Sequence, residues 1–230
     1  MTATVTARTT AARGRAALLG CVLTWALLLG LPAAVAAQDP APFAIRGFGD
    51  VSLLSFTAKE SFETIFGSST GWSFGGGVDV VTRKHLFGSL RASRFRREGE
   101  RVFVFGGEIF PLGTPTTVTI TPLEVTVGYR VDRGWRVVPY GGGGVGWHRY
   151  EETSPGAIED EDAKETFLGY HIVGGAEIAI ARWLSAAGEG QWTAVPEALG
   201  QDPNGVSGFF GEDDLGGASV RVKVIVGWGR

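Results

Sequence analysis

The chain has 230 residues, with 21 basic residues against 24 acidic ones and a formal net charge of −3 at neutral pH. Its length fits one domain, and it has no lysine- or arginine-rich run of the kind that binds nucleic acid. The one cysteine, Cys21, lies near the N-terminus, so the chain after it has no disulfide, metal–thiolate site or thiol nucleophile. We therefore expect no nucleic-acid partner, no metal site and no cofactor.

The first 37 residues have the organisation of a secretory signal peptide. Arginines between residues 8 and 15 precede an apolar stretch at 16–31, and small residues follow at 32–37. A basic start, an apolar core and a small-residue end are the parts of a cleaved signal. The core is short for a transmembrane helix of about 20 residues. We predict a signal peptide at 1–37 and a mature domain at 38–230.

From Phe43 onward, apolar and polar residues alternate with a period of two, which indicates β-strands with two different faces. In the last segment, Val222 and Val224 fall on one face, whereas Arg221 and Lys223 fall on the other. We predict eight such strands. Their expected ranges are 43–56, 71–81, 86–97, 116–131, 135–151, 165–178, 183–195 and 216–229.

The predicted connections alternate in length. The expected short turns are 82–85, 132–134 and 179–182, and the expected long polar loops are 57–70, 98–115, 152–164 and 196–215. Short turns at one end and long loops at the other, on an even number of antiparallel strands, are typical of an outer-membrane barrel. The sequence therefore predicts an all-β fold, an eight-stranded antiparallel up-and-down transmembrane β-barrel in the cell outer membrane. The long loops then face the outside of the cell.

The alternation also predicts which residues lie inside the barrel. In hydrocarbon, strands can cross only as a closed barrel, so their apolar faces meet lipid and their polar faces turn inward. The ten charged residues that this assigns to the interior are Arg46, Asp50, Asp79, Arg91, Glu124, Arg130, Glu177, Glu189, Arg221 and Lys223. Buried charge is tolerated when it is paired. We expect Arg91 to meet Glu124, and Glu189 to meet Arg221 or Lys223.

Aromatic residues near the strand ends predict two interfacial girdles. Those at the short-turn end are Tyr129, Trp135, Trp183 and Trp228, and those at the long-loop end are Trp72, Trp147, Tyr150 and Trp192. Near the second long loop, four arginines are candidates for contacts with phosphates of outer-leaflet lipopolysaccharide, since guanidinium binds phosphate with two hydrogen bonds. They are Arg94, Arg96, Arg97 and Arg101.

Two segments resemble the small OmpA/OmpX-type outer-membrane β-barrel family. Residues 121–131 resemble that family's fourth strand, and residues 138–146, with their Pro-Tyr-glycine sequence, resemble the strand that follows it. The resemblance covers about 43–230 and implies a monomeric barrel that the barrel-assembly machinery inserts. Members often end in an aromatic residue that this machinery reads, whereas here Gly229 and Arg230 follow Trp228.

Three kinds of function are compatible with such a barrel. Lipid A deacylases of this size pair a histidine with a serine two residues later, but neither His148 nor His171 is followed by one, and His85 lies in a predicted turn. We therefore predict no catalytic site. The interior of eight strands is just filled by side chains, which disfavours a wide channel. The sequence favours a non-enzymatic barrel with a charged, closed lumen and a structural or surface-interaction role. A narrow conduit for small or hydrophobic molecules is the alternative.

Overall fold

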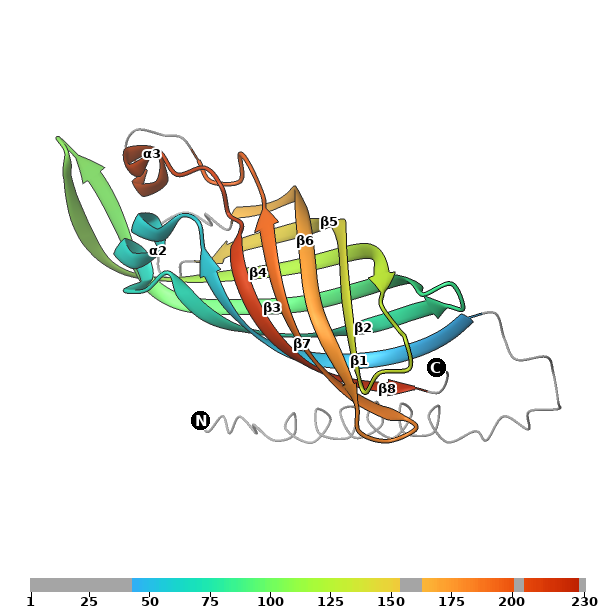
Figure 1. The fold of residues 1–230 in the computed structure, drawn as a ribbon. Coiled ribbons are helices and arrows are strands. Elements are labelled where there is room, and N and C mark those ends of the chain that lie inside the picture. Colours follow the sequence, from blue (N-terminus) through green and yellow to red (C-terminus); the bar gives the residue numbers. More distant parts are fainter. Residues whose placement is uncertain (1–42, 154–162, 201–204, 228–230) are drawn as a thin grey trace, which may run out of the picture. The chain divides into compact units, whose positions relative to one another are not determined.

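The computed structural model describes residues 43–153, 163–200 and 205–227. Eight antiparallel strands form a closed barrel in which each strand pairs with the next along the chain and β8 pairs with β1 (Figure 1). The strands are β1 (Phe43–Phe56), β2 (Thr70–Thr82), β3 (Leu86–Phe105), β4 (Glu108–Arg130), β5 (Val137–Thr153), β6 (Ala163–Ala179), β7 (Leu184–Ala194) and β8 (Gly217–Gly227). The predicted eight-stranded barrel is confirmed.

Three predicted features lie wholly or partly outside the described residues: the signal peptide at 1–37, the loop at 152–164 and Trp228. Among the described helices, none is long and apolar enough to cross a membrane.

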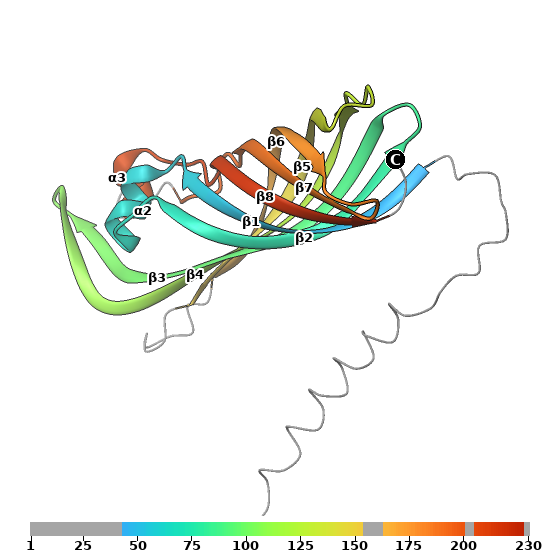
Figure 2. The ribbon, with the colours of Figure 1, turned by 60° about the horizontal axis from the view of Figure 1, so that its bottom comes forward.

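The connections are sorted by length between the two ends of the barrel. At one end, which we call the turn end, short turns join β2 to β3, β4 to β5 and β6 to β7. The other end, the loop end, carries α2 (Lys59–Phe66), α3 (Val206–Phe210) and the tip of the β3–β4 hairpin (Figures 1 and 2). Both helices fall in segments that the sequence predicts as long loops.

The predicted polar loop at 98–115 is wrong, because β3 and β4 continue through it as a paired hairpin. The hairpin turns at Gly106 and Gly107, whose φ angles of +62° and +85° are ones that glycine adopts readily. Phe103 lies opposite Phe110 near the tip. With 20 and 23 residues, β3 and β4 far exceed the roughly 9–11 residues that a transmembrane strand needs, so the hairpin extends beyond the membrane.

The outside of the barrel is apolar and the inside is charged. On β8, Val222 and Val224 are 61% and 51% exposed, whereas Arg221 and Lys223 are 4% and 5% exposed. A soluble barrel has the opposite arrangement. An apolar exterior around a polar interior is the arrangement that a bilayer requires.

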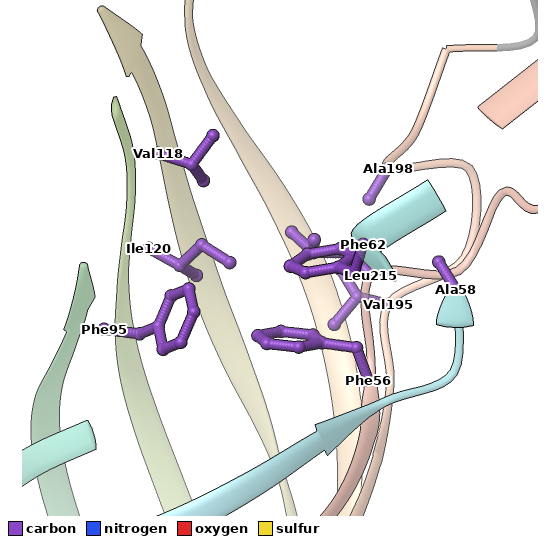
Figure 3. Close-up of a cluster of buried hydrophobic side chains, with 9 residues drawn as sticks. All are labelled: Phe56, Ala58, Phe62, Phe95, Val118, Ile120, Val195, Ala198 and Leu215. Carbon is purple, nitrogen blue, oxygen red and sulfur yellow. The ribbon is translucent and has the colours of Figure 1, made fainter. Parts of the chain in front are cut away.

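An apolar cluster, which we call the apolar plug, fills the interior at the loop end (Figure 3). Phe62 of α2 stacks on Phe56 of β1, with ring centroids 4.0 Å apart, and Phe95 of β3 meets Phe56 edge-on at 5.1 Å. The other members are Ala58, Val118, Ile120, Val195, Ala198 and Leu215. The plug therefore binds α2 to the inside of the barrel mouth through the hydrophobic effect.

The segment between β7 and β8 anchors the start of α2. Glu212 accepts hydrogen bonds from the backbone N–H groups of Glu60, at 3.1 Å, and Ser61, at 2.9 Å, and from the Ser61 hydroxyl at 2.7 Å. Ala58, at the N-cap position, has no side-chain acceptor. Glu212 therefore satisfies N–H groups that the helix leaves unpaired and adds a favourable negative charge at its N-terminus.

Candidate functional site

All ten charged residues assigned to the interior are buried there, with exposed fractions between 3% and 8%. They come from every strand except β5. Five are basic and five are acidic, so the formal charges balance. Side chains alternate strictly across a strand, which is why the period-two pattern places them on one face. Their contacts determine what this interior is able to do.

The contacts nearest the turn end centre on Glu177 of β6. Its Oε1 lies 2.8 Å from Nη1 of Arg46, and its Oε2 lies 2.6 Å from Nη1 of Arg130. Arg46 also approaches Asp79, with 3.6 Å between Nη2 and Oδ2. One carboxylate thus serves two guanidinium groups, and charge-assisted hydrogen bonds of this length are strong.

Farther toward the loop end, Arg91 joins two carboxylates. Its Nη2 lies 2.7 Å from Oδ1 of Asp50, and its Nη1 lies 2.9 Å from Oε2 of Glu124. Arg91 and Glu124 are direct partners in the β3–β4 ladder, as the sequence predicts. Gln191 donates to Oε1 of Glu124 at 2.7 Å and accepts a hydrogen bond from Arg221. The amide of Gln191 therefore links two ion pairs.

Lys223 and Glu189 connect the contacts around Glu177 with those around Arg91. Nζ of Lys223 lies 3.0 Å from Oε1 of Glu189 and 3.7 Å from Oδ2 of Asp79. Arg221, the ladder partner of Glu189, has its Nε 3.2 Å from Oε2 of that residue. Contacts of this kind join all ten charges and Gln191 into one chain, which we call the charged network. Because each charge has an opposite partner, the network reduces the cost of burial.

Inward-facing glycines make room for the long side chains of the network. A Cβ at Gly75 would lie 2.9 Å from Nη2 of Arg91, and one at Gly175 would lie 2.9 Å from Cγ of Glu189. At Gly175 the ring of Tyr140 is also within 3.1 Å, and its hydroxyl donates to Glu189 at 2.6 Å. The side chains of Arg91 and Glu189 therefore pack against inward positions that have no side chain. The alternation alone does not reveal this feature.

Two histidines lie inside the barrel. Nε2 of His171 is 2.8 Å from Oγ1 of Thr126, and its Nδ1 is 3.9 Å from Oε1 of Glu124. This order of groups resembles a nucleophile, a base and an orienting acid. However, Glu124 is already engaged by Arg91 and Gln191, and neither Thr126 nor His171 lines a described cavity. Glu124 therefore serves the charged network.

The interior is divided along its length. A small cavity between the charged network and the apolar plug is lined by both, including Arg91, Glu124 and Phe95. At the loop end, beyond the plug, a cavity of about 340 Å³ lies against α2 and is lined by Phe62 and Val118. At the turn end, a cavity of about 430 Å³ ends at the network. The network and the plug thus separate the three cavities.

Six of the predicted girdle residues have exposed rings: Tyr129, Trp135 and Trp183 at the turn end and Trp72, Trp147 and Trp192 at the loop end. Trp135 and Trp183 also line the turn-end cavity. Tyr150 is a correction, because its side chain packs against the apolar plug and its hydroxyl donates to Glu152 at 3.0 Å. Tyr150 is three positions after the outward-facing Trp147 on β5, so the two side chains point to opposite faces.

The four arginines near the β3–β4 hairpin do not form one cluster. Arg94 and Arg96 are exposed on the outer face of β3. Arg97 turns instead to the end of α2 and donates to the carbonyl oxygens of Phe66, at 3.3 Å, and Thr70. Arg101 lines the loop-end cavity. Of the four, only Arg94 and Arg96 are largely exposed.

The family profile for the outer membrane protein beta-barrel domain matches residues 23–207. Neisserial surface protein A (NspA) has a similar structure, with a TM-score of 0.50 and 11% identity over 82% of this chain and 99% of NspA. OprG of Pseudomonas aeruginosa has a TM-score of 0.43 and 15% identity over 80% of this chain and 92% of OprG. Ail, the attachment invasion locus protein of Yersinia pestis, has a TM-score of 0.40 and 8% identity over 81% of this chain and 96% of Ail.

None of the curated proteins matches the chain. The profile match spans most of the sequence, and the closed eight-stranded barrel with its apolar exterior agrees with it. The chain belongs to the outer membrane protein β-barrel domain family and is a small β-barrel protein of the cell outer membrane.

Proposed function

We propose that this chain is a non-enzymatic, non-conducting barrel that contributes to envelope structure and presents a surface for contacts outside the cell. The observation that carries this proposal is the charged network, which pairs ten buried charges across the lumen. The apolar plug adds a second barrier nearer the loop end. An ion or solute entering the barrel would have to break paired charges and displace packed phenylalanines, and both are costly.

A narrow conduit is the competing function, and the end cavities of about 340 and 430 Å³ are the observation that favours it. Liposome swelling separates the two functions. We expect liposomes containing the refolded protein to swell in arabinose or glycerol no faster than protein-free liposomes. A general porin in parallel liposomes shows that the assay detects permeation. Swelling that increases with the amount of protein would overturn the proposal in favour of a conduit.

The outer face of β3 supports the surface role. Along it, charged residues from Arg94 to Glu100 follow the apolar, lipid-facing part of the strand, and Phe103 and Phe105 come next. Together with Phe110 on β4, these phenylalanines are 42%, 69% and 44% exposed at the hairpin tip. We place Arg94 and Arg96 at the level of the lipopolysaccharide phosphates, where guanidinium groups bind them bidentately.

The variant Arg94→Gln/Arg96→Gln tests this contact. We expect it to bind lipopolysaccharide at least fivefold more weakly than the parent in a titration of the refolded protein. Lys84→Gln is the matched control, because it removes an exposed positive charge at the turn end that does not line the cavity there. Equal binding by the parent and the double variant would exclude these arginines from the contact, as would an equal loss in the control.

A further inference from the structure

The cavity at the turn end, which we call the vestibule, has a volume of about 430 Å³. Its floor is the near end of the charged network, and its walls come from the three short turns. Basic residues dominate its lining. They are Arg46, Arg83, Arg130, Arg136 and Arg182, with His85, against the two carboxylates Asp132 and Glu177.

The carboxylates of the vestibule are already engaged. Glu177 serves both Arg46 and Arg130 on the floor, at 2.8 and 2.6 Å. Asp132 accepts a hydrogen bond from the backbone N–H of Gly134 at 3.0 Å. The floor is therefore close to neutral, and the turn arginines Arg83, Arg136 and Arg182 outnumber Asp132, which gives the vestibule a net positive charge. Like charges around one cavity repel each other, so an anion inside it is attracted to the whole set.

Arg46, on the floor of the vestibule, is a buried member of the charged network. The residue is 7% exposed, and its Nε has no hydrogen-bond partner among the described residues. Its terminal nitrogens are the ones that meet Glu177 and Asp79. Buried guanidinium N–H groups are normally paired, and an unpaired one costs free energy. The pairing of the guanidinium groups at the floor of the vestibule is therefore incomplete among the described residues.

Two tryptophans complete the lining. Trp135 and Trp183 come from different turns, are about half exposed and line the same cavity as the arginines. The guanidinium carbon of Arg133 lies 5.7 Å from the centre of the Trp135 ring, which brings a further positive charge to this turn. Indole rings offer an apolar surface beside the charged groups. The lining thus suits a ligand with an anionic group and a small apolar or sugar-like body.

We propose that the vestibule binds the phosphate group of an anionic ligand on the periplasmic side of the barrel. Its volume is in the range of small-molecule sites, and arginine binds phosphate oxygens with two parallel hydrogen bonds. The loop-end cavity provides a contrast, because its lining combines Arg101 with the two carboxylates of Glu152 and Glu165. Two sources share this chemistry: a soluble phosphate ester of the periplasm, and the headgroup of an anionic phospholipid in the inner leaflet.

The test uses the protein refolded in octyl glucoside, a detergent without phosphate, with inorganic pyrophosphate as the probe in calorimetry and tryptophan fluorescence. We expect saturable binding, and at least tenfold weaker binding by Arg136→Gln/Arg182→Gln. Both side chains are exposed and lie in turns, so the barrel should still fold, which circular dichroism checks. Arg149→Gln removes the same kind of charge at the loop end and should bind as the parent does.

Two competitors then identify the source. Dioctanoyl phosphatidylglycerol that displaces pyrophosphate at lower concentration than glycerol 1-phosphate indicates a lipid headgroup, and the reverse order indicates a soluble ester. No saturable binding of pyrophosphate by the parent would overturn the proposal. An equal loss in Arg149→Gln would overturn it too, as would the failure of both competitors to displace the probe.

Discussion

Single residues in the interior are coupled because several of them share a partner. Arg91 contacts both Asp50 and Glu124, and Glu124 also accepts a hydrogen bond from Gln191. Removing one member of a buried pair leaves the other charge uncompensated in a medium of low dielectric constant. The effects of substitutions should therefore depend strongly on which other members of the charged network are present.

We expect Arg91→Met and Glu124→Gln each to lower the free energy of unfolding by about 3–5 kcal/mol, as is typical when one partner of a buried pair is lost. The double variant should lose clearly less free energy of unfolding than the sum of the two single losses. Its recovery is incomplete because Asp50 also loses Arg91, so adding Asp50→Asn should restore more. Urea unfolding in detergent micelles measures these free energies.

The exposed pair of Arg96 and Glu98 is a matched control for this cycle, with side chains 58% and 76% exposed and 3.6 Å between Nη2 and Oε1. Its double-mutant cycle should give a coupling of about 0–1 kcal/mol, because solvent screens the interaction. Strictly additive losses for Arg91 and Glu124 would refute the importance of their pairing.

At the scale of the elements, the sequence predicts the strands better than what lies between them. Alternation of apolar and polar residues specifies each strand and its inward face, because a shift by one residue would expose Arg221 or Lys223 to lipid. The β3–β4 extension is not predicted in this way, since the charged residues before Val102 suggest a loop. A continuous run of four β-favouring apolar residues, Val102 to Phe105, is the signal in the sequence that points to a strand there.

The helices and several side-chain positions could not be predicted in the same way. α2 has eight residues and no capping side chain of its own, so it depends on packing against Phe56 and on Glu212. Glu212 lies 151 positions from Ser61, so the sequence near α2 does not reveal this contact. Isolated helices of this length are unstable in water. Alternation separates Arg97 from Arg94 and Arg96, because it falls on the other face of the strand, but only the tertiary structure brings it to the end of α2.

The anchoring of α2 predicts a local effect of Glu212→Ala. The substitution leaves the N–H groups of Glu60 and Ser61 without their acceptor, and we expect α2 to loosen by about 1–2 kcal/mol. Hydrogen exchange of the α2 amides should accelerate roughly 5- to 30-fold, while exchange in the barrel strands stays unchanged. Asp213→Ala, at the neighbouring position, is the control. Unchanged exchange in α2 would contradict the anchoring role.

For the whole molecule, the short turns at one end of the barrel and the long connections at the other predict its orientation in the membrane. The signal peptide expected at 1–37 delivers the chain to the periplasm, so the loop end should face outward and the turn end inward. An epitope tag inserted at Ser68 should be labelled on intact cells, whereas a tag at Lys84 should be labelled only after permeabilisation. Labelling of the Lys84 tag on intact cells would reverse the orientation and remove the vestibule from the periplasm.

A closed interior is the central claim, and single-channel recording across a planar bilayer tests it most directly. Eight strands leave only the space that side chains fill, and here paired charges and phenylalanines occupy it. The refolded protein should insert without current steps above those of the bare bilayer at 100 mV in 1 M KCl, conditions in which a porin control conducts. Reproducible, uniform steps in proportion to inserted protein would contradict the claim and show that ions pass the charged network.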